Sequence, residues 1–273
     1  AWESPCELTS RLESPDRATG EHLLTVLGAG GWGVRQRREV DTCSAGASLI
    51  TLSQALSNGA AQQEQALLWR LNSDVGPRFA QPLIQGAMFS QYTFPYQVWK
   101  EGSTRGAQWE RLAPGSCLLR PQFLLKVDDA QEPEGYGYKL VFRRIARATD
   151  ERTLIAAMIL DLPCGDKAPV LQSGDVWSDL ALCGLLNSLM VDAHMRRNLS
   201  SANLDWHRIS QLPLPARDNP LVEKVIAPLA LLLSCGNPLY SPLWDSLQGS
   251  GELIQGVASS HGPWELPRST LRE

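Results

Sequence analysis

The sequence lacks any apolar stretch of the ~20 residues that a membrane-spanning helix needs, because its hydrophobic runs are short and interrupted by Gly, Pro or charge. Its first residues also lack the basic start and apolar stretch of a secretion signal. We therefore expect a cytoplasmic location and no membrane partner. The chain starts at Ala1 without an initiator Met, and we interpret it as a fragment.

Patterns for metal binding and nucleophilic catalysis are missing as well. The cysteines are far apart and include no C-x-x-C pair, which predicts scattered reduced thiols. The histidines are isolated, with neither H-E-x-x-H nor a Ser/His/Asp set, so we predict no metal and no hydrolase chemistry. The residues concerned are Cys6, Cys43, Cys117, Cys164, Cys183, Cys235, His22, His194, His207 and His261.

The chain has no overall excess of positive charge, since its net charge is −4. This argues only weakly against a nucleic-acid binder, because phosphate contacts need local positive potential. Residues 138–152 hold five basic residues and two acidic ones, a local net charge of +3. The basic residues are Lys139, Arg143, Arg144, Arg147 and Arg152. The positive charge is therefore concentrated in one segment.

The chain does contain enough apolar residues, 43%, for one large globular unit or two smaller ones. In residues 138–159, two β-forming runs flank a turn-like sequence, which favours a β-hairpin. A helix that begins at Asp150 with Thr149 as its cap is the alternative. Residues 54–66 are polar and predict a flexible insertion.

Two helices are predicted in the C-terminal part of the chain. From Leu182 to Ala193, apolar residues recur at i, i+3, i+4, i+7, i+8 and i+11, which predicts one amphipathic helix that continues to about Arg197. A second helical run covers residues 221–233, with a bend at Pro228. We also expect Asn187 to hold the helix against the sheet, together with Ser188.

Two motifs are similar to nucleotide or cofactor sites but lack the expected surroundings. Gly28, Gly30 and Gly33 match the G-x-G-x-x-G of dinucleotide-binding loops, yet no apolar helix follows, and we interpret them as a tight turn. The sequence NPLY at 237–240 is similar to the N-P-P-Y of amino-methyltransferases, where the aromatic ring stacks on a flipped base. A leucine replaces the second proline, and we predict a helix-ending turn without catalytic function.

The arginines of the basic segment are candidate DNA contacts, because guanidinium groups can bind phosphate or the O6/N7 edge of guanine through two hydrogen bonds. If this segment is a strand, Arg143 and Arg147 face one side and Arg144 the other, so they cannot all contact DNA. A salt-bridged strand surface is the alternative. Arg196 and Arg197 are candidate phosphate contacts, and a solvated helix end explains them equally well.

Three segments of the second half resemble a known family in the same order along the chain. YKLVFRRIARATDERTLIAAMI at 138–159 is similar to the family stretch lvfR-ia-stdeRTliaaiiP. GLLNSLMVDAHMRR at 184–197 is similar to its lLNS-vfdyllR helix, and NLDWHRISQLPLP at 203–215 to its nln-f-i-qlPlP signature. The family is the C-terminal target-recognition domain of Eco57I-like and TaqI-like adenine-N6 DNA methyltransferases of restriction-modification systems.

Three more segments extend the resemblance to most of the chain. GWGVRQRREVDT at 31–42, PLIQGAMFSQY at 82–92 and WELPRSTLRE at 264–273 are similar to family segments in the right order. Gln85 and Ala87 depart from the acidic and basic residues usual in the second of these segments. In such enzymes the cofactor motif and N-P-P-Y precede this domain, which implies that the catalytic core is absent from this chain.

The resemblance implies sequence-specific docking on double-stranded DNA, so that a methyltransferase catalytic domain, in cis or in trans, methylates an adenine at N6. The full-length enzyme would use S-adenosyl-L-methionine, while this chain would bind no cofactor and would not be catalytic alone. Two alternatives are a stand-alone DNA specificity subunit and, with less support, a dinucleotide-binding enzyme. The expected DNA-binding residues are Arg143, Arg144, Arg147, Arg152, Arg196, Arg197 and Asn203.

We expect an α+β fold with twisted β-sheets and hairpins followed by a helical region. Residues 1–30 would be the end of a preceding domain or a linker. Residues 31–175 would form the β-rich DNA-recognition region. Residues 176–273 would form a helical and loop region that completes this unit and is truncated at its C-terminus.

Overall fold

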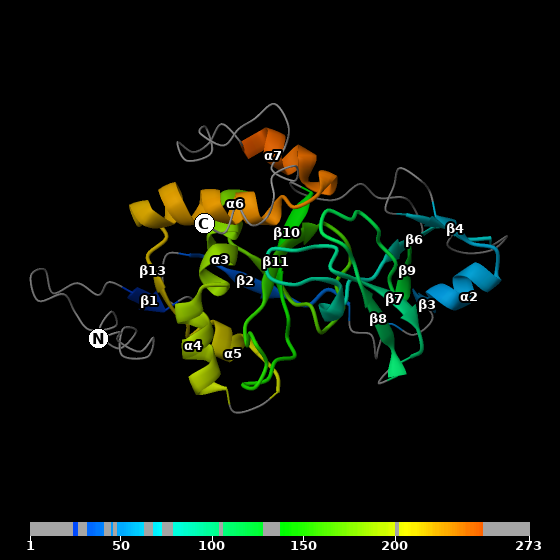
Figure 1. Ribbon diagram of the computed structural model, residues 1–273, viewed down its shortest axis with the longest axis horizontal. Coiled ribbons are helices and arrows are strands. Elements are labelled where there is room, and N and C mark those ends of the chain that lie inside the picture. Colours follow the sequence, from blue (N-terminus) through cyan, green and yellow to red (C-terminus); the bar gives the residue numbers. More distant parts are fainter. Residues whose placement is uncertain are drawn as a thin grey trace, which may run out of the picture.

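The computed structural model describes residues 24–26, 32–40, 45, 48–62, 68–72, 79–103, 106–127, 137–199 and 202–247. The fold combines antiparallel sheets with helices, which confirms the α+β class. The larger helices gather at one end of the molecule and a five-stranded sheet lies at the other (Figure 1). In the described part of the chain, the α-helices are α3 (Val176–Leu186), α4 (Leu189–Asn198), α5 (Trp206–Ile209), α6 (Ala227–Ser234) and α7 (Ser241–Leu247), together with α2 (Leu52–Ser57), which lies beside the five-stranded sheet.

Within the described residues, the strands form four sheets. The central sheet has the order β11 (Ala156–Leu160), β10 (Tyr138–Phe142), β12 (Val170–Gln172) and β2 (Arg35–Arg37). The five-stranded sheet has the order β3 (Leu49–Thr51), β9 (Phe123–Val127), β6 (Phe79–Pro82), β5 (Trp69–Arg70) and β4 (Ala61–Gln62). Two pairs complete the set: β1 (Leu24–Val26) with β13 (Pro213–Pro215), and β7 (Gln97–Glu101) with β8 (Gln108–Arg111).

The predicted hairpin at 138–159 is confirmed as the antiparallel pair β10–β11, in which Tyr138 lies opposite Leu160. Both of its faces are buried, which explains why the strands are apolar without alternation. Leu140 and Met158 belong to the cluster that contains the helices, whereas Val141 and Ile159 belong to a second cluster. The hairpin is therefore the middle layer of the molecule.

Strand β10 ends at Phe142, so Arg143, Arg144 and Arg147 lie beyond the strand, and the alternation that a strand would impose does not apply to them. The N–H of Arg144 donates to Lys167 O (3.1 Å), and Arg144 O accepts from Leu204 N (2.7 Å). Because these bonds lead the backbone away from the hairpin ladder, residues 143–155 form a long connection. This connection lies beside α4 and α5.

The prediction of one helix from 182 to 197 is also wrong, because α3 and α4 are separate and bent by 64°. Asn187 ends α3, and the Ser188 hydroxyl accepts from Val191 N and so caps α4. Leu189, which the periodicity placed on the buried face, is 68% exposed. No single helix in the described ranges has the length and apolarity to cross a membrane, although the bent pair meets those criteria when joined.

The other sequence predictions have mixed outcomes. Residues 222–226 are π-helical and lead into α6, so the helical character of 221–233 is confirmed. The polar segment 54–66 is not an unstructured insertion over its described part, since it contributes to α2 and β4. Of residues 1–30, expected to be the end of a preceding domain or a linker, the structure describes Leu24–Val26, which pair with β13; the rest lies outside the described residues. Residues on both sides of position 175, the expected boundary between the β-rich and the helical region, belong to one cluster of buried hydrophobic side chains.

Candidate nucleic-acid interface

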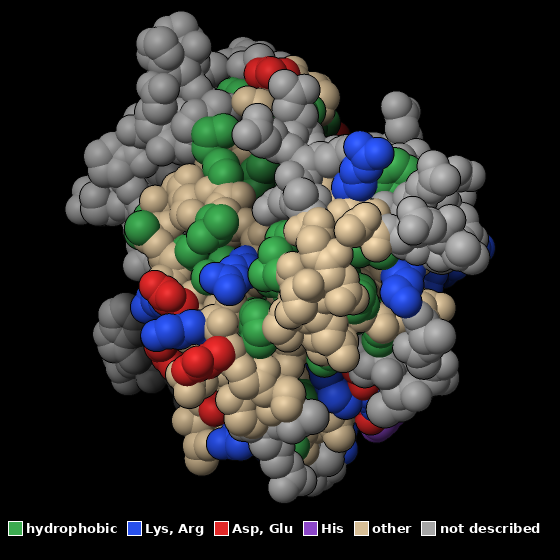
Figure 2. Space-filling model, turned by 90° about the vertical axis from the view of Figure 1, so that its right-hand side faces the viewer, with side chains coloured by type: hydrophobic (Ala, Val, Ile, Leu, Met, Phe, Trp, Pro, Cys, Tyr) green, Lys and Arg blue, Asp and Glu red, His purple; other side chains and the backbone are tan. Residues whose placement is uncertain are grey.

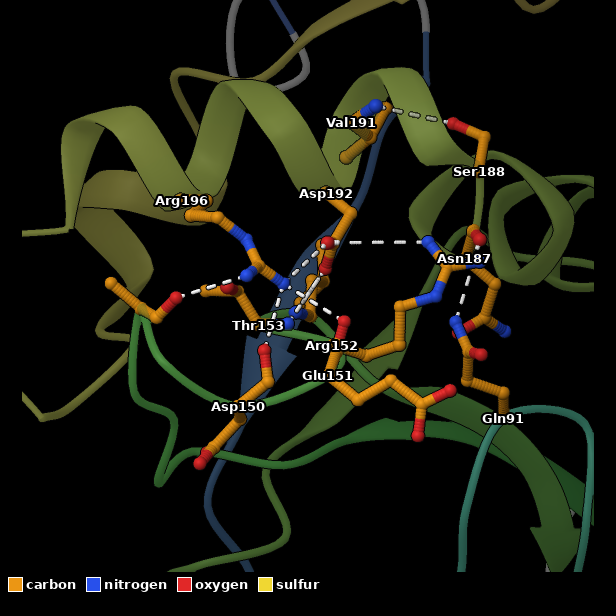
Figure 3. Close-up of polar contacts among 12 residues, drawn as sticks. Gln91, Asp150, Glu151, Arg152, Thr153, Asn187, Ser188, Val191, Asp192 and Arg196 are labelled. Atoms are coloured by element: carbon orange, nitrogen blue, oxygen red, sulfur yellow. Dashed lines mark hydrogen bonds and ion pairs between the residues drawn. The ribbon is translucent and has the colours of Figure 1, made fainter.

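The connection 143–155 carries most of the predicted DNA contacts, and Asp192 on α4 fixes its second half. The Asp192 side chain is buried, and its Oδ1 accepts from Thr153 N (2.7 Å) and Leu154 N (2.9 Å). Figure 3 shows this carboxylate at the centre of the contacts that join α4 to the connection. A charged acceptor forms stronger hydrogen bonds than a neutral one, so this contact restrains the backbone at 153–154.

Arg196 restrains the middle of the same connection. Its guanidinium donates to the carbonyl oxygens of Ala148 (3.0 Å), Asp150 (2.9 Å) and Glu151 (2.9 Å), and lies 3.3 Å from Asp192 Oδ2. A guanidinium with this many partners within the protein has little capacity left for a phosphate. Arg196, predicted as a DNA contact, therefore holds the loop in place.

Arg143 and Arg144 are also engaged within the protein. Arg143 donates to Phe89 O through Nε (3.0 Å) and Nη2, and its guanidinium lies over the rings of Phe89 and Tyr96. Burial lowers the pKa of Arg143, although an arginine stays charged. Arg144 donates to Asp205 Oδ1 from Nε (3.0 Å) and Nη2 (2.9 Å). Arg144 is therefore ion-paired within the protein. Such a salt bridge was the alternative to a DNA contact in the sequence analysis.

The remaining residues that were predicted to bind DNA differ in whether their side chains have partners within the protein. Arg147 and Arg197 are exposed, and their side chains form no hydrogen bond or ion pair with another described residue. Arg152 is half-buried, with its Nη1 4.0 Å from Asp192 Oδ2 and without a hydrogen-bond partner there. The backbone of Asn203 forms a bridge with Ile145. The structure therefore leaves Arg147 and Arg197 as the two predicted arginines that are free to contact a ligand.

Two hollows lie side by side at the connection. The first has a volume of about 570 Å³, the second of about 340 Å³, and Arg143 and Ile145 line both. The charged residues that line the first hollow are Arg111, Arg143, Asp150, Glu151 and Arg152. Beside the two shared residues, the second hollow is lined by the polar residues Gln85, Gln97, Gln122 and Lys167 and by Gly86, Ala87, Ala107 and Trp109. Lys167 Nζ forms an ion pair with Asp166 Oδ2 (2.9 Å).

Sequence reasoning missed Arg111, Lys167 and Ile145 as neighbours of this site. Arg111 lies at the end of β8 and Lys167 in the turn before β12, far from the basic segment in sequence. Neither the count of basic residues nor the apolar periodicity could predict that Arg111 and Lys167 lie near the connection 143–155 in the folded chain. Figure 2 shows Lys and Arg side chains dispersed singly on one face of the molecule, among polar and hydrophobic side chains.

The NPLY sequence has a structural function, as predicted. Asn237 donates through Nδ2 to Phe94 O (2.8 Å), and its Oδ1 accepts from Leu239 N (3.0 Å). Tyr240 is fully buried and its hydroxyl donates to Met158 O (2.6 Å), so its ring cannot stack on a base. Of the glycine motif, Gly28 and Gly30 lie outside the described residues, while Gly33 has a φ of +60°.

The described cysteines Cys117, Cys164, Cys183 and Cys235 are free thiols, as predicted for these four. No group of three or more His, Cys, Asp or Glu side chains in the described ranges could hold a metal ion. No family model, no characterised protein and no solved structure matches this chain. A functional interpretation therefore depends on the sequence resemblance and on the geometry of the chain itself.

Proposed function

We propose that this chain is the DNA target-recognition region of an adenine-N6 DNA methyltransferase, with S-adenosyl-L-methionine bound by a catalytic domain outside it. The chain would dock on duplex DNA so that the catalytic domain can reach a flipped adenine. Most of the affinity would come from phosphate contacts, and specificity from a few side chains in a groove.

The observation that carries this proposal is that the three segments with the strongest resemblance are in direct contact. Residues 138–159 meet 184–197 through Asn187, whose amide forms hydrogen bonds with both backbone groups of Ala156. Residues 203–215 meet 138–159 through the Ile145–Asn203 bridge and the Arg144–Asp205 ion pair. Segments that follow a family's order are expected to form one unit if the resemblance is genuine.

Arg147 and Arg197 are the phosphate contacts that fit this proposal best, because both are exposed and have no side-chain partner among the described residues. Arg147 lies on the connection that Asp192 and Arg196 restrain. A restrained loop loses less conformational entropy when it binds, which favours affinity.

Salt-dependent DNA binding tests the proposal. Fluorescence anisotropy with a randomised duplex, repeated at increasing NaCl concentration, gives the slope of log K against log salt concentration. Each lost phosphate contact should reduce the magnitude of that slope by about 0.9, so Arg147→Ala and Arg197→Ala should each reduce it by this amount. Lys224→Ala is the matched control, since Lys224 is an exposed cation on the π-helical turn 222–226 and lines neither hollow.

Two results would contradict the proposal. Absence of DNA binding by the wild-type chain even at low salt would reject DNA recognition. Loss of binding in Lys224→Ala equal to that in Arg147→Ala would indicate a nonspecific charge effect. The methyltransferase half is tested by methylation-sensitive sequencing of a host that expresses the full-length gene, where N6-methyladenine should occur at one recurrent sequence.

A further inference from the structure

We propose that Arg196 is a positioning residue that joins Arg147 and Arg197 into one phosphate-binding unit. This inference rests on the proposed function and assigns a common origin to its two phosphate contacts. Arg196 does not contact DNA itself; it holds the turn that carries Arg147 against the helix that carries Arg197. From the sequence alone, Arg196 was expected to contact a phosphate directly.

Arg147 lies at the start of a closed turn. Asp150 N donates to Arg147 O (3.1 Å), and Arg147 N donates to Asp150 Oδ2 (3.1 Å). A turn that is closed by a backbone hydrogen bond and by a carboxylate acceptor has few alternative conformations. The backbone of Arg147 is therefore fixed relative to Asp150, while its side chain is exposed and has no partner among the described residues.

Arg196 ties this turn to α4. Its Nη1 donates to Ala148 O inside the turn (3.0 Å), and its Nη2 donates to Asp150 O and Glu151 O at the end of the turn (2.9 Å each). Figure 3 shows this side chain reaching from α4 to these carbonyl groups. One planar guanidinium thus bonds to three acceptors of the connection, a pattern that its fork of donors permits.

Asp192 fixes the orientation of this guanidinium. The two residues are four positions apart on α4, and Asp192 Oδ2 lies 3.3 Å from Arg196 Nη2. The other oxygen of the same carboxylate accepts from Thr153 N and Leu154 N. Helix α4 therefore holds the connection at two places, through a cation and through an anion that also bind each other. Charge-assisted hydrogen bonds of this kind are stronger than neutral ones.

The same contact determines where Arg197 lies. Arg197 follows Arg196 in the last turn of α4, and its side chain is exposed and has no partner in the described part of the chain. The end of this helix is also held, because Arg208 Nη1 donates to Asn198 O. The backbones of Arg147 and Arg197 consequently keep a fixed separation. Two linked cations bind two phosphates with a smaller loss of conformational entropy than two independent ones.

A positioning residue and a direct phosphate contact have different effects on binding. Loss of a phosphate contact reduces the salt slope, because fewer counterions are released. Loss of a positioning residue weakens the affinity at an unchanged slope, because the same phosphates are bound from a loop that must first be ordered. The effect of Arg196 should also disappear when Arg147, through which it acts, is removed.

Fluorescence anisotropy with a randomised duplex at a series of NaCl concentrations tests this inference. Arg196→Gln and Arg196→Lys should each weaken DNA binding about fivefold without changing the salt slope. In the Arg147→Ala background, Arg196→Lys should change the affinity by less than about twofold. Arg217→Lys is the matched control, since the Arg217 side chain is 39% exposed against 37% for Arg196 but pairs with Asp175; it should bind as wild type.

A second cycle tests whether the two contacts form one unit. In the wild-type chain, the double variant Arg147→Ala plus Arg197→Ala should bind more tightly than the two single losses indicate, because either loss already breaks the unit. In the Arg196→Lys background, the two losses should be additive. Additive losses in the wild-type chain would contradict the inference.

The outcomes also separate this inference from the proposed function. If Arg196→Lys binds as wild type, or if Arg196→Gln reduces the salt slope by about 0.9, Arg196 contacts phosphate directly and only the inference fails. If Arg196→Lys is equally harmful with and without Arg147, or accelerates amide exchange in β10 and β11, its function is general stabilisation and again only the inference fails. If the wild-type chain binds no DNA, the proposed function fails as well.

Discussion

Asn187 joins the helices to the hairpin through both ends of a single side-chain amide. Its Oδ1 accepts from Ala156 N (3.0 Å) and its Nδ2 donates to Ala156 O (2.8 Å). Strand β11 is at the edge of its sheet, so these backbone groups have no neighbouring strand on that side. The expectation that Asn187 fixes the helix against the sheet is confirmed, and Ser188 adds the cap that starts α4.

Replacing Asn187 should therefore cost more than replacing an exposed asparagine. Asn187→Ala leaves the buried N–H of Ala156 without this acceptor, while Ala156 O keeps Tyr92 N as a donor (3.3 Å), so the free energy of unfolding should fall by about 1–3 kcal/mol. Urea denaturation measures this loss. Asn198→Ala is the control, because its exposed side-chain amide donates to His194 O in its own helix and to no other described residue, and it should cost less than about 1 kcal/mol. Equal losses in the two variants would contradict the assigned role.

Tyr138 should give the protein a characteristic alkaline response. Burial raises the pKa of Tyr138 to about 12 from its ordinary value of 10.0, and its hydroxyl donates to Leu239 O. A raised pKa means that the folded state holds this proton more tightly than the unfolded state. The stabilising contribution is fully present below pH 10 and is lost as the pH rises from about 10 to 12.

Tyr138→Phe isolates this contribution. The variant should be less stable than wild type at neutral pH because it lacks the hydrogen bond, but its stability should decline less steeply between pH 10 and 12. Below pH 9 the two proteins should have parallel stability curves, which provides an internal control. Urea denaturation at a series of pH values measures both ranges. Parallel curves up to pH 12 would show that this tyrosine does not carry the pH dependence.

At the scale of the elements, α3 and the π-helical turn before α6 approach closely at Gly184. A Cβ placed on Gly184 would lie 2.6 Å from Ile226 Cγ2 and 3.4 Å from Ala230 Cβ. Such a distance is too short for two carbon atoms, so a side chain here requires the Ile226 side chain or the helical segments to shift. Glycine fits this close approach, even though it weakens a helix intrinsically.

Gly184→Ala should consequently destabilise the protein by about 1–3 kcal/mol through overpacking, in spite of the higher helix propensity of alanine. Ile226→Ala removes the contacted methyl group, so the double variant should be more stable than the sum of the two single losses indicates. Thermal and urea unfolding of the four proteins in this cycle provide the measurement. Additive losses would mean that the close approach does not govern the stability of this contact.

The sequence predicted elements better than it predicted how they connect. The apolar runs of 138–159 were enough for the hairpin, because local pattern determines a strand pair. The break between α3 and α4 was missed because the periodicity continues through it, while Ser188 was not weighed as a cap. Helix α2 was missed because the segment is polar, although Thr51 and Gln54 form a capping box at its start.

The candidate site was less predictable than the fold, because its charges are paired over long sequence separations. Arg144 and Asp205 are 61 positions apart, and Arg196 bonds to carbonyl groups more than 40 positions before it. A count of basic residues cannot distinguish an arginine that holds a loop from one that is free. Only the tertiary contacts separate Arg147 and Arg197 from Arg143, Arg144 and Arg196.

At the scale of the whole molecule, the hairpin β10–β11 is packed on both faces, whereas the five-stranded sheet packs on a separate cluster of buried hydrophobic side chains. This cluster is smaller than the one that the hairpin shares with the helices. The smaller cluster contains Leu52, Ala55, Ala60, Trp69, Ala80, Trp99 and Leu124. The helices and the hairpin share a much larger one. Regions with fewer buried apolar contacts open at lower free energy than the main core. The sheet should therefore open before the hairpin does.

Hydrogen exchange of two core variants tests this division. Leu124→Ala and Leu140→Ala each remove a fully buried leucine and should each cost about 2–5 kcal/mol locally. Leu124→Ala should accelerate amide exchange in strands β3, β5, β6 and β9 of the five-stranded sheet and leave β10, β11 and α3 protected. Leu140→Ala should accelerate exchange in the hairpin and in the helices that pack on it, because they share its cluster. Uniform acceleration throughout the chain in Leu124→Ala would instead mean that the sheet and the hairpin unfold as one cooperative unit, and that the connection 143–155 could not stay ordered while the sheet opens.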